Sequence, residues 1–190
     1  MILLLAIIVG LLAGLVRAWA SGRRLAAPDL KLIWVVPLAF LPQFFAFLLP
    51  STRANFPDQW IPIALIGSQF LLVIFAAVNL RQPGVWLLGL GLMLNFSVII
   101  SNGGWMPISP ETVMRLAPDA PSNSWAVGER LGVTKDKVLL APETQLWTLS
   151  DRFILPNWTQ YHLVFSIGDV LIALGAIWFL WSLGGHGNVR

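Results

Sequence analysis

The sequence has no cysteine and only two histidines, and charged residues make up 11% of its 190 residues. The absence of cysteine excludes disulfide bonds, thiolate nucleophiles and thiolate metal ligands, and two histidines are too few for a histidine-rich metal site. We therefore expect no metal and no other cofactor. Soluble domains contain about 25% charged residues, so the composition argues against a soluble protein. The net charge of +3 is too small to indicate nucleic-acid binding.

Apolar residues are abundant instead: 57% of the chain is hydrophobic, and the mean hydropathy is +0.76. A helix that crosses a membrane needs about 20 mostly apolar residues. Five segments meet this requirement, namely residues 1–20, 32–49, 61–80, 85–101 and 163–183. We predict an all-α membrane protein in which residues 1–190 form a single integral membrane domain, a bundle of five transmembrane helices.

The first apolar segment could also be the core of a signal peptide. However, the small-residue site Ala18-Trp19-Ala20 contains a tryptophan, and no basic residue precedes the apolar run. Signal peptides have a basic region before the apolar core and small residues at the cleavage site. We therefore expect a retained helix.

Basic residues predict the orientation of the bundle. Arg23, Arg24 and Lys31 lie between the first two apolar segments, and Arg81 lies between the third and the fourth. Cytoplasmic loops of membrane proteins are enriched in lysine and arginine. We therefore predict that the N-terminus is outside and the C-terminus is cytoplasmic, which places residues 102–162 on the extracytoplasmic side.

Residues 102–162, which we call the cap, are too many for a simple connection, because structureless loops longer than about 12 to 15 residues are usually functional or disordered. The motif Ser109-Pro110-Glu111 is typical of the start of a helix. Residues 137–140 and 145–149 favour two strands around a turn. We therefore expect a small cap that contains a short helix and a β-hairpin.

Asp169 is the one ionisable residue well inside the apolar segments. Such a residue costs about 2.5 to 3.5 kcal/mol on insertion scales, so it needs a partner or a function. Asp151, at the end of the cap, is the nearest acidic residue that the chain can return to it. Two carboxylates that share a site cannot both ionise cheaply, so such a pair can hold one proton and activate a water molecule. The alternative is structural, with Ser166-Ile167-Gly168-Asp169 capping a helix.

Several other polar residues are candidates for supporting roles. Asn95, Gln43 and Gln69 either form hydrogen bonds between helices or line a cavity. The turn Asn102-Gly103-Gly104 either exposes backbone N–H groups to a carbonyl or an anion, or is a plain helix end. Arg152 either pairs with Asp151 or holds an anionic lipid head group. His162 is either an acid or base near Asp169 or an interfacial side chain.

The acidic residues occur in two motifs, Thr148-Leu149-Ser150-Asp151-Arg152 and Phe165-Ser166-Ile167-Gly168-Asp169, and Ile172 and Gly175 follow the second. This pattern resembles the two aspartate motifs of the signal peptidase II family, bacterial enzymes that process lipoproteins. The resemblance implies that Asp151 and Asp169 are catalytic, with Arg152, Ser166 and Gly168 beside them. It also implies a membrane-anchored peptide or lipoprotein as the substrate.

The sequence departs from that family at three positions of the two motifs. Thr148 and Ser166 stand where the family has asparagine, and Gly168 replaces an alanine. A second resemblance covers nearly the whole chain: Asn102-Gly103-Gly104-Trp105-Met106-Pro107 and Ser166-Ile167-Gly168-Asp169 are similar to motifs of a bacterial family of polytopic membrane proteins of unknown function. It implies a multi-pass protein of the bacterial plasma (inner) membrane and no particular activity.

The sequence leaves three functions open. The first is an intramembrane aspartyl hydrolase that uses Asp151 and Asp169 at the outer membrane face. The second is a non-catalytic accessory subunit that packs against other membrane subunits. The third is a component of proton- or cation-coupled transport. A single buried acid gives this function little support, and transporters usually show internal repeats or paired broken helices, which the sequence does not. In each case the lipid bilayer is a partner and nucleic acid is not.

Overall fold

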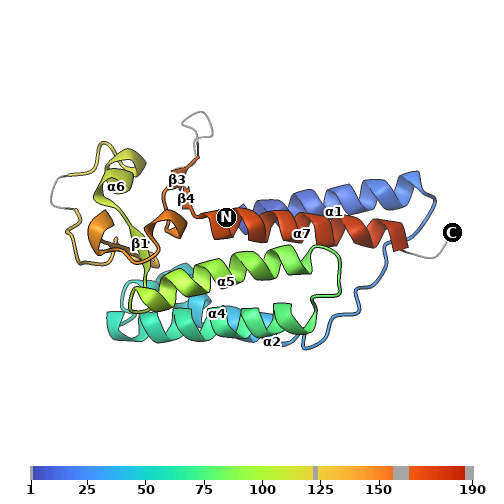
Figure 1. The fold of residues 1–190 in the computed structure, drawn as a ribbon, viewed down its shortest axis with the longest axis horizontal. Coiled ribbons are helices and arrows are strands. Elements are labelled where there is room, and N and C mark those ends of the chain that lie inside the picture. The colour runs from blue at the N-terminus through green and yellow to red at the C-terminus, as the bar shows by residue number, and fades with distance from the viewer. Residues whose placement is uncertain (1, 122–123, 156–162, 187–190) are drawn as a thin grey trace.

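The structure is a computed structural model, and it describes residues 2–121, 124–155 and 163–186. Five helices run alongside one another, and the cap lies at one end of them (Figure 1). These helices are α1 (Ile2–Ala20), α2 (Val35–Gln43), α4 (Ile61–Val78), α5 (Val85–Ser101) and α7 (Ile167–His186). A π-helical turn, η1 (Phe44–Leu48), continues α2, and the short helices α3 (Pro50–Arg53) and η2 (Asp58–Trp60) lead into α4.

All five predicted apolar segments contain a helix, but they differ in length. Three helices, at residues 2–20, 58–78 and 167–185, are long and apolar enough to cross a membrane, which indicates a membrane protein. The helices at 35–48 and 85–101 are apolar but shorter. The α7 helix begins four residues later than predicted, because residues 164–165 form a strand instead.

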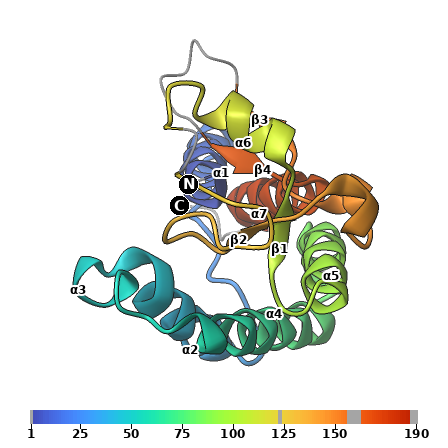
Figure 2. The ribbon, with the colours of Figure 1, turned by 90° about the vertical axis from the view of Figure 1, so that its left-hand side faces the viewer.

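The five helices pack in a row rather than in a closed ring. Each contacts the next in the order α1, α7, α5, α4, α2. Seen from the cap end, the row curls so that α1 and α2 are its two ends (Figure 2). Among the described residues, α1 and α2 do not form a comparably packed pair. We call the side of the row where α1 and α2 are not packed against each other its open side.

Glycines let α1, α7 and α5 approach one another closely. A Cβ atom added to Gly14 of α1 would lie 2.5 Å from the carbonyl oxygen of Leu180 in α7. On the other side of α7, a Cβ atom added to Gly91 of α5 would lie 2.8 Å from the backbone nitrogen of Ile172. Small residues at helix interfaces allow such close backbone contacts in membranes. The glycines of α1 thus pack within the chain.

The cap is built around a short parallel pair of strands. Strand β1 (Met106–Ile108) pairs with β2 (Asp136–Val138), with Met106 opposite Asp136. Helix α6 (Pro110–Leu116) follows β1 and covers the pair with Val113. It begins as predicted, because the backbone N–H of Thr112 donates to the Ser109 hydroxyl at 3.2 Å. The short turns η3 (Ala141–Glu143) and η4 (Trp147–Leu149) come next.

The predicted β-hairpin at residues 137–149 is wrong. Strand β2 pairs with the buried β1 instead, and residues 147–149 form a helical turn. Leu146 has φ of +54°, a left-handed conformation that interrupts an extended strand. A different antiparallel pair, β3 (Phe153–Ile154) and β4 (Val164–Phe165), connects the cap to α7.

The contact between α1 and α7 gives a testable prediction. Gly14→Ala should lower the free energy of unfolding by about 1–3 kcal/mol, because the added methyl group overlaps the backbone of α7. Gly67→Ala in α4 is the matched control, since nothing lies within 4 Å of a Cβ atom there. Unfolding of the purified protein in detergent measures both, and equal stability of the two variants would contradict the packing described here.

Candidate functional site

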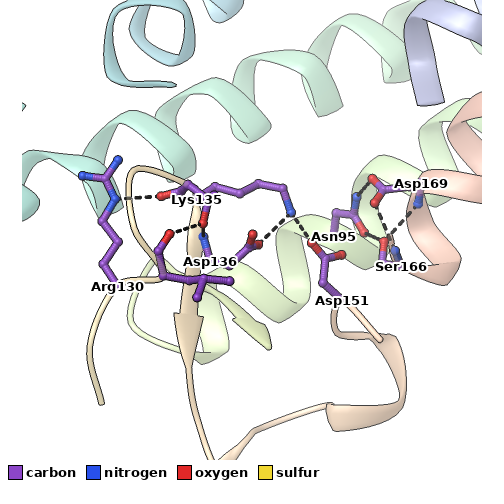
Figure 3. A network of polar contacts seen from close by, with 9 residues as sticks. Asn95, Arg130, Lys135, Asp136, Asp151, Ser166 and Asp169 are labelled. Atoms are coloured by element: carbon purple, nitrogen blue, oxygen red, sulfur yellow. Dashed lines mark hydrogen bonds and ion pairs between the residues drawn. The ribbon is translucent and has the colours of Figure 1, made fainter. Parts of the chain in front are cut away.

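A cluster of polar side chains lies where the cap meets the helices (Figure 3). Helix α5 and the beginning of α7 supply one part of it, and the cap supplies the other, with Asp136 in β2, Lys135 directly before β2, and Asp151 in an isolated bridge beside β1. The members are Asn95, Lys135, Asp136, Asp151, Ser166 and Asp169. The cluster therefore joins segments that are distant in the sequence.

Asp169 is the third residue of α7, and it forms a reciprocal capping box with Ser166. The backbone N–H of Asp169 donates to the Ser166 hydroxyl, and the backbone N–H of Ser166 donates to Oδ2 of Asp169, both at 3.0 Å. This arrangement satisfies N–H groups that a helix start leaves unpaired. The structural alternative, in which this motif caps a helix, is therefore the arrangement observed. It explains why α7 starts at Ile167.

Asn95 connects this capping box to α5. Its Nδ2 donates to Oδ1 of Asp169 at 2.8 Å, and its Oδ1 accepts from the Ser166 hydroxyl at 2.8 Å. Gly168 makes this possible, because a Cβ atom there would overlap the Asn95 amide. Asn95, Ser166 and Asp169 thus form a closed hydrogen-bonded unit, and both oxygens of Asp169 already accept a hydrogen bond.

Asp151 belongs to the other part of the cluster. Its backbone N–H donates to the carbonyl of Pro107 at 3.2 Å, which places it beside β1. The side chain is 1% exposed. Oδ2 accepts from the ammonium of Lys135, whereas the buried Oδ1 has no hydrogen-bond partner. Lys135 also contacts Oδ1 of Asp136 at 3.2 Å, so two carboxylates share one ammonium.

The charges of the cluster act on one another. Burial raises the pKa of Asp151 to about 8, and the negative charges of Asp136 and Asp169 add to the effect, while Lys135 opposes it. For Lys135, burial lowers the pKa, but the three carboxylates outweigh it and raise the pKa overall. Lys135 therefore stays protonated at neutral pH, and burial brings the pKa of Asp151 to about 8.

A cavity of about 550 Å³ opens inside the curl of helices, below the cluster. Its polar lining residues are Gln43, Gln69, Asn95, Lys135 and Asp169. Its apolar lining comes from all five long helices, with Ile2 and Leu3 of α1, Val36, Pro37 and Phe40 of α2, and Leu72, Leu92 and Ile172 deeper in. Oε1 of Gln69 is buried there without a partner. The cavity is thus apolar along its walls and polar at the cap end.

The structure brings Asp151 and Asp169 into one cluster but not into a direct pair. Asp151 is held by Lys135, and Asp169 is held by Asn95 and Ser166. No hydrogen bond joins the two carboxylates in the part of the chain that the structure describes. Their interaction is electrostatic, since the charge of Asp169 raises the pKa of Asp151.

Arg152 is not the ion-pair partner of Asp151. Its guanidinium lies 4.1 Å from the centre of the Trp147 ring, a cation–π contact that leaves it at the edge of the cap. The ion-pair partner of Asp151 is instead Lys135. Of the two roles that the sequence left open for Arg152, pairing with Asp151 is therefore not the one observed.

The Asn102-Gly103-Gly104 turn connects α5 to the cap. The Asn102 amide donates to the carbonyl of Gln145 at 2.9 Å and accepts from its backbone N–H at 3.0 Å. Gly103 and Gly104 have φ of +68° and +87°, which favours glycine. Gly104 also lies against Pro62, where a side chain would not fit. These contacts fix the position of the cap on α4 and α5.

Sequence reasoning missed Lys135 and Asp136. They lie in a stretch of mixed charge that resembles a solvated loop, and a parallel pairing across about thirty residues has no local signal. His162 lies outside the described residues. Within those residues, no group of three or more histidine and acidic side chains is arranged to hold a metal ion.

The raised pKa of Asp151 predicts how stability depends on pH. The unfolded chain ionises Asp151 near its ordinary pKa of 3.8, whereas the folded protein keeps the proton up to about pH 8. The stabilisation from Asp151 should therefore be complete below pH 3.8 and be lost as the pH rises toward 8. Asp151→Asn should abolish this part of the pH dependence. Denaturation profiles of both proteins measure it, and parallel profiles would contradict the assignment.

The comparisons with known proteins give one family. No curated protein and no solved structure matches the chain significantly. The model of a family of unknown function, DUF5317, matches residues 28–181, which include α2, α4, α5, the cap and most of α7. Because the match covers most of the sequence, the chain belongs to the DUF5317 family.

Proposed function

We propose that this membrane protein binds an amphiphile from the bilayer, with its apolar chain inside the curl of helices and its head group at the polar cluster. The observation that carries the proposal is the cavity of about 550 Å³, which is apolar along the helices and polar next to Lys135 and Asp169. Ligand cavities commonly have volumes of about 300–1,000 Å³ with a few polar groups that fix the orientation.

The open side of the curl supports entry from the bilayer. Residues of both α1 and α2 line the cavity, although these two helices are not packed together. The end away from the cap is crossed by the segment between α1 and α2. Asn79 binds both the N–H and the carbonyl of Lys31, at 2.8 and 2.9 Å, and Ala26 donates to the carbonyl of Leu183 at 3.0 Å. The lateral opening between α1 and α2 is therefore the route that the packing favours.

Basic residues predict which end of the cavity faces the cytoplasm. Arg23, Arg24, Lys31 and Arg81 lie at the end away from the cap, so the positive-inside rule puts that end in the cytoplasm. The N-terminus and the cap then lie on the extracytoplasmic side of a bacterial plasma membrane. The polar cluster faces the outer leaflet in this orientation.

Hydrolysis is a second candidate, and the raised pKa of Asp151 favours it. A buried carboxyl that keeps its proton next to an ionised carboxylate can serve as the acid of an acid–base pair. Asp169 would take a proton from water, the hydroxide would add to an amide carbonyl, and Asp151 would give its proton to the leaving nitrogen as the C–N bond breaks. The hydrogen bonds that already occupy Asp169 weigh against this role.

Filling the cavity tests the binding function. Val36→Trp should reduce the amount of bound lipid that survives purification by about tenfold, because Val36 lines the cavity and the larger side chain occupies it. Leu41→Trp is the control, since Leu41 is exposed on the same helix and does not line the cavity. Native mass spectrometry of both variants measures the bound lipid. Equal occupancy in the two would reject the cavity as the binding site.

The hydrolase candidate needs a different readout. Asp151→Asn and Asp169→Asn should each abolish processing of membrane-anchored proteins in cells that lack the wild-type copy, because the acid and the base are both required. Lys137→Gln in the cap is the control, because Lys137 lies outside the cluster. Normal processing in both aspartate variants would eliminate hydrolysis while leaving amphiphile binding open. Partner chains that co-purify in fixed ratio would instead favour an accessory subunit.

A further inference from the structure

We propose that the occupant of the cavity is a phospholipid whose head group ends in a primary ammonium. This inference rests on the proposed amphiphile binding and adds the class of head group. It follows from two independent features of the polar end, the balance of charge and the kind of hydrogen-bonding atom that lacks a partner.

The charge of the cluster is negative. One ammonium, that of Lys135, faces the carboxylates of Asp136, Asp151 and Asp169. Even when Asp151 carries a proton, two carboxylates remain for one ammonium. A second anion would therefore be repelled, whereas a cation would balance the charge. Arg130 does not supply that balance, because its guanidinium already pairs with the carboxylate of Asp58 at 3.0 Å.

The unpaired polar atom that lines the cavity is an acceptor. Oε1 of Gln69 is buried without a hydrogen-bond partner. A buried polar atom without a partner costs about 1–3 kcal/mol, so this oxygen favours a donor. Asp151 also has an unpaired oxygen, but its side chain is 1% exposed, lies between Lys135 and the Asn95 unit (Figure 3) and does not line the cavity. A primary ammonium has three N–H donors and no acceptor, which fits the Gln69 oxygen.

Gln69 and Asp169 line the same cavity at similar depths. Gln69 is eight residues into α4, and Asn95, which holds Asp169, is six residues from the end of α5. At 1.5 Å per residue these positions lie about 12 and 9 Å from the cap end of the helices, within one turn of each other. All three residues line the same cavity, as do the aromatic rings of Phe40 and Phe165. Aromatic faces also attract ammonium groups.

The test compares three phospholipids with identical acyl chains on the full-length protein. Phosphatidylethanolamine has the primary ammonium, phosphatidylcholine has the same charge without N–H donors, and phosphatidylglycerol has hydroxyl donors without a cation. Native mass spectrometry should find about tenfold higher occupancy for phosphatidylethanolamine than for either of the others. Equal occupancy of the three, or a preference for phosphatidylglycerol, would overturn the inference and leave the proposed function intact.

Two substitutions assign the preference to the site. Gln69→Leu should remove most of the selectivity without loss of stability, because the amide oxygen has no partner to lose. Asp169→Asn should weaken selectivity by removing a negative charge. Gln145→Leu, on the exposed surface of the cap, should keep it. Unchanged selectivity in Gln69→Leu would refute the head-group assignment, whereas retention of no lipid by the wild-type protein would refute amphiphile binding itself.

Discussion

The hydrogen-bonded unit of Asn95, Ser166 and Asp169 is the connection on which the rest of the structure depends. It fixes the first turn of α7 against α5, and Gly168 lets the two backbones meet there. Among the described residues, helix α1 packs chiefly on α7, so its position follows from this connection. Strand β4 leads directly into Ser166, so the cap is held at the same point. A buried polar unit is favourable only when each member is satisfied, as these three side chains are.

The second part of the cluster is less completely hydrogen-bonded. Lys135 must serve both Asp136 and Asp151, which leaves one oxygen of Asp151 buried and unpaired. Buried ions cost several kcal/mol each unless hydrogen bonds and opposite charges compensate them. The unpaired oxygen is a place where a proton can reside, in agreement with the raised pKa of Asp151.

Much of the helical part could be predicted from the sequence, because long apolar runs are a strong signal. Residues 85–101 form α5 with the predicted bounds, and Asn95 and Ser166 were both identified as supporting residues. The motif around Asp169 predicted either the N-terminal capping of a helix or a catalytic pair, and the observed hydrogen bonds are those of helix capping. The pairing of β2 with β1 could not be predicted, because it depends on tertiary contacts between distant segments. Lys135 was missed for this reason, and the sequence alone could not decide between the two roles that it left open for Arg152.

The open row of helices is understandable only with the bilayer as solvent. In water, the apolar faces of α1 and α2 would close on each other, because burying them is strongly favourable. Lipid chains are as apolar as leucine, so no such drive exists in a membrane and the gap can stay filled with lipid. The walls of the cavity can therefore accept any acyl chain. Its polar end cannot, because Gln69, Lys135 and Asp169 would meet hydrocarbon unless a matching group were present. In the proposed lipid binding, selectivity therefore arises at the cap end of the cavity.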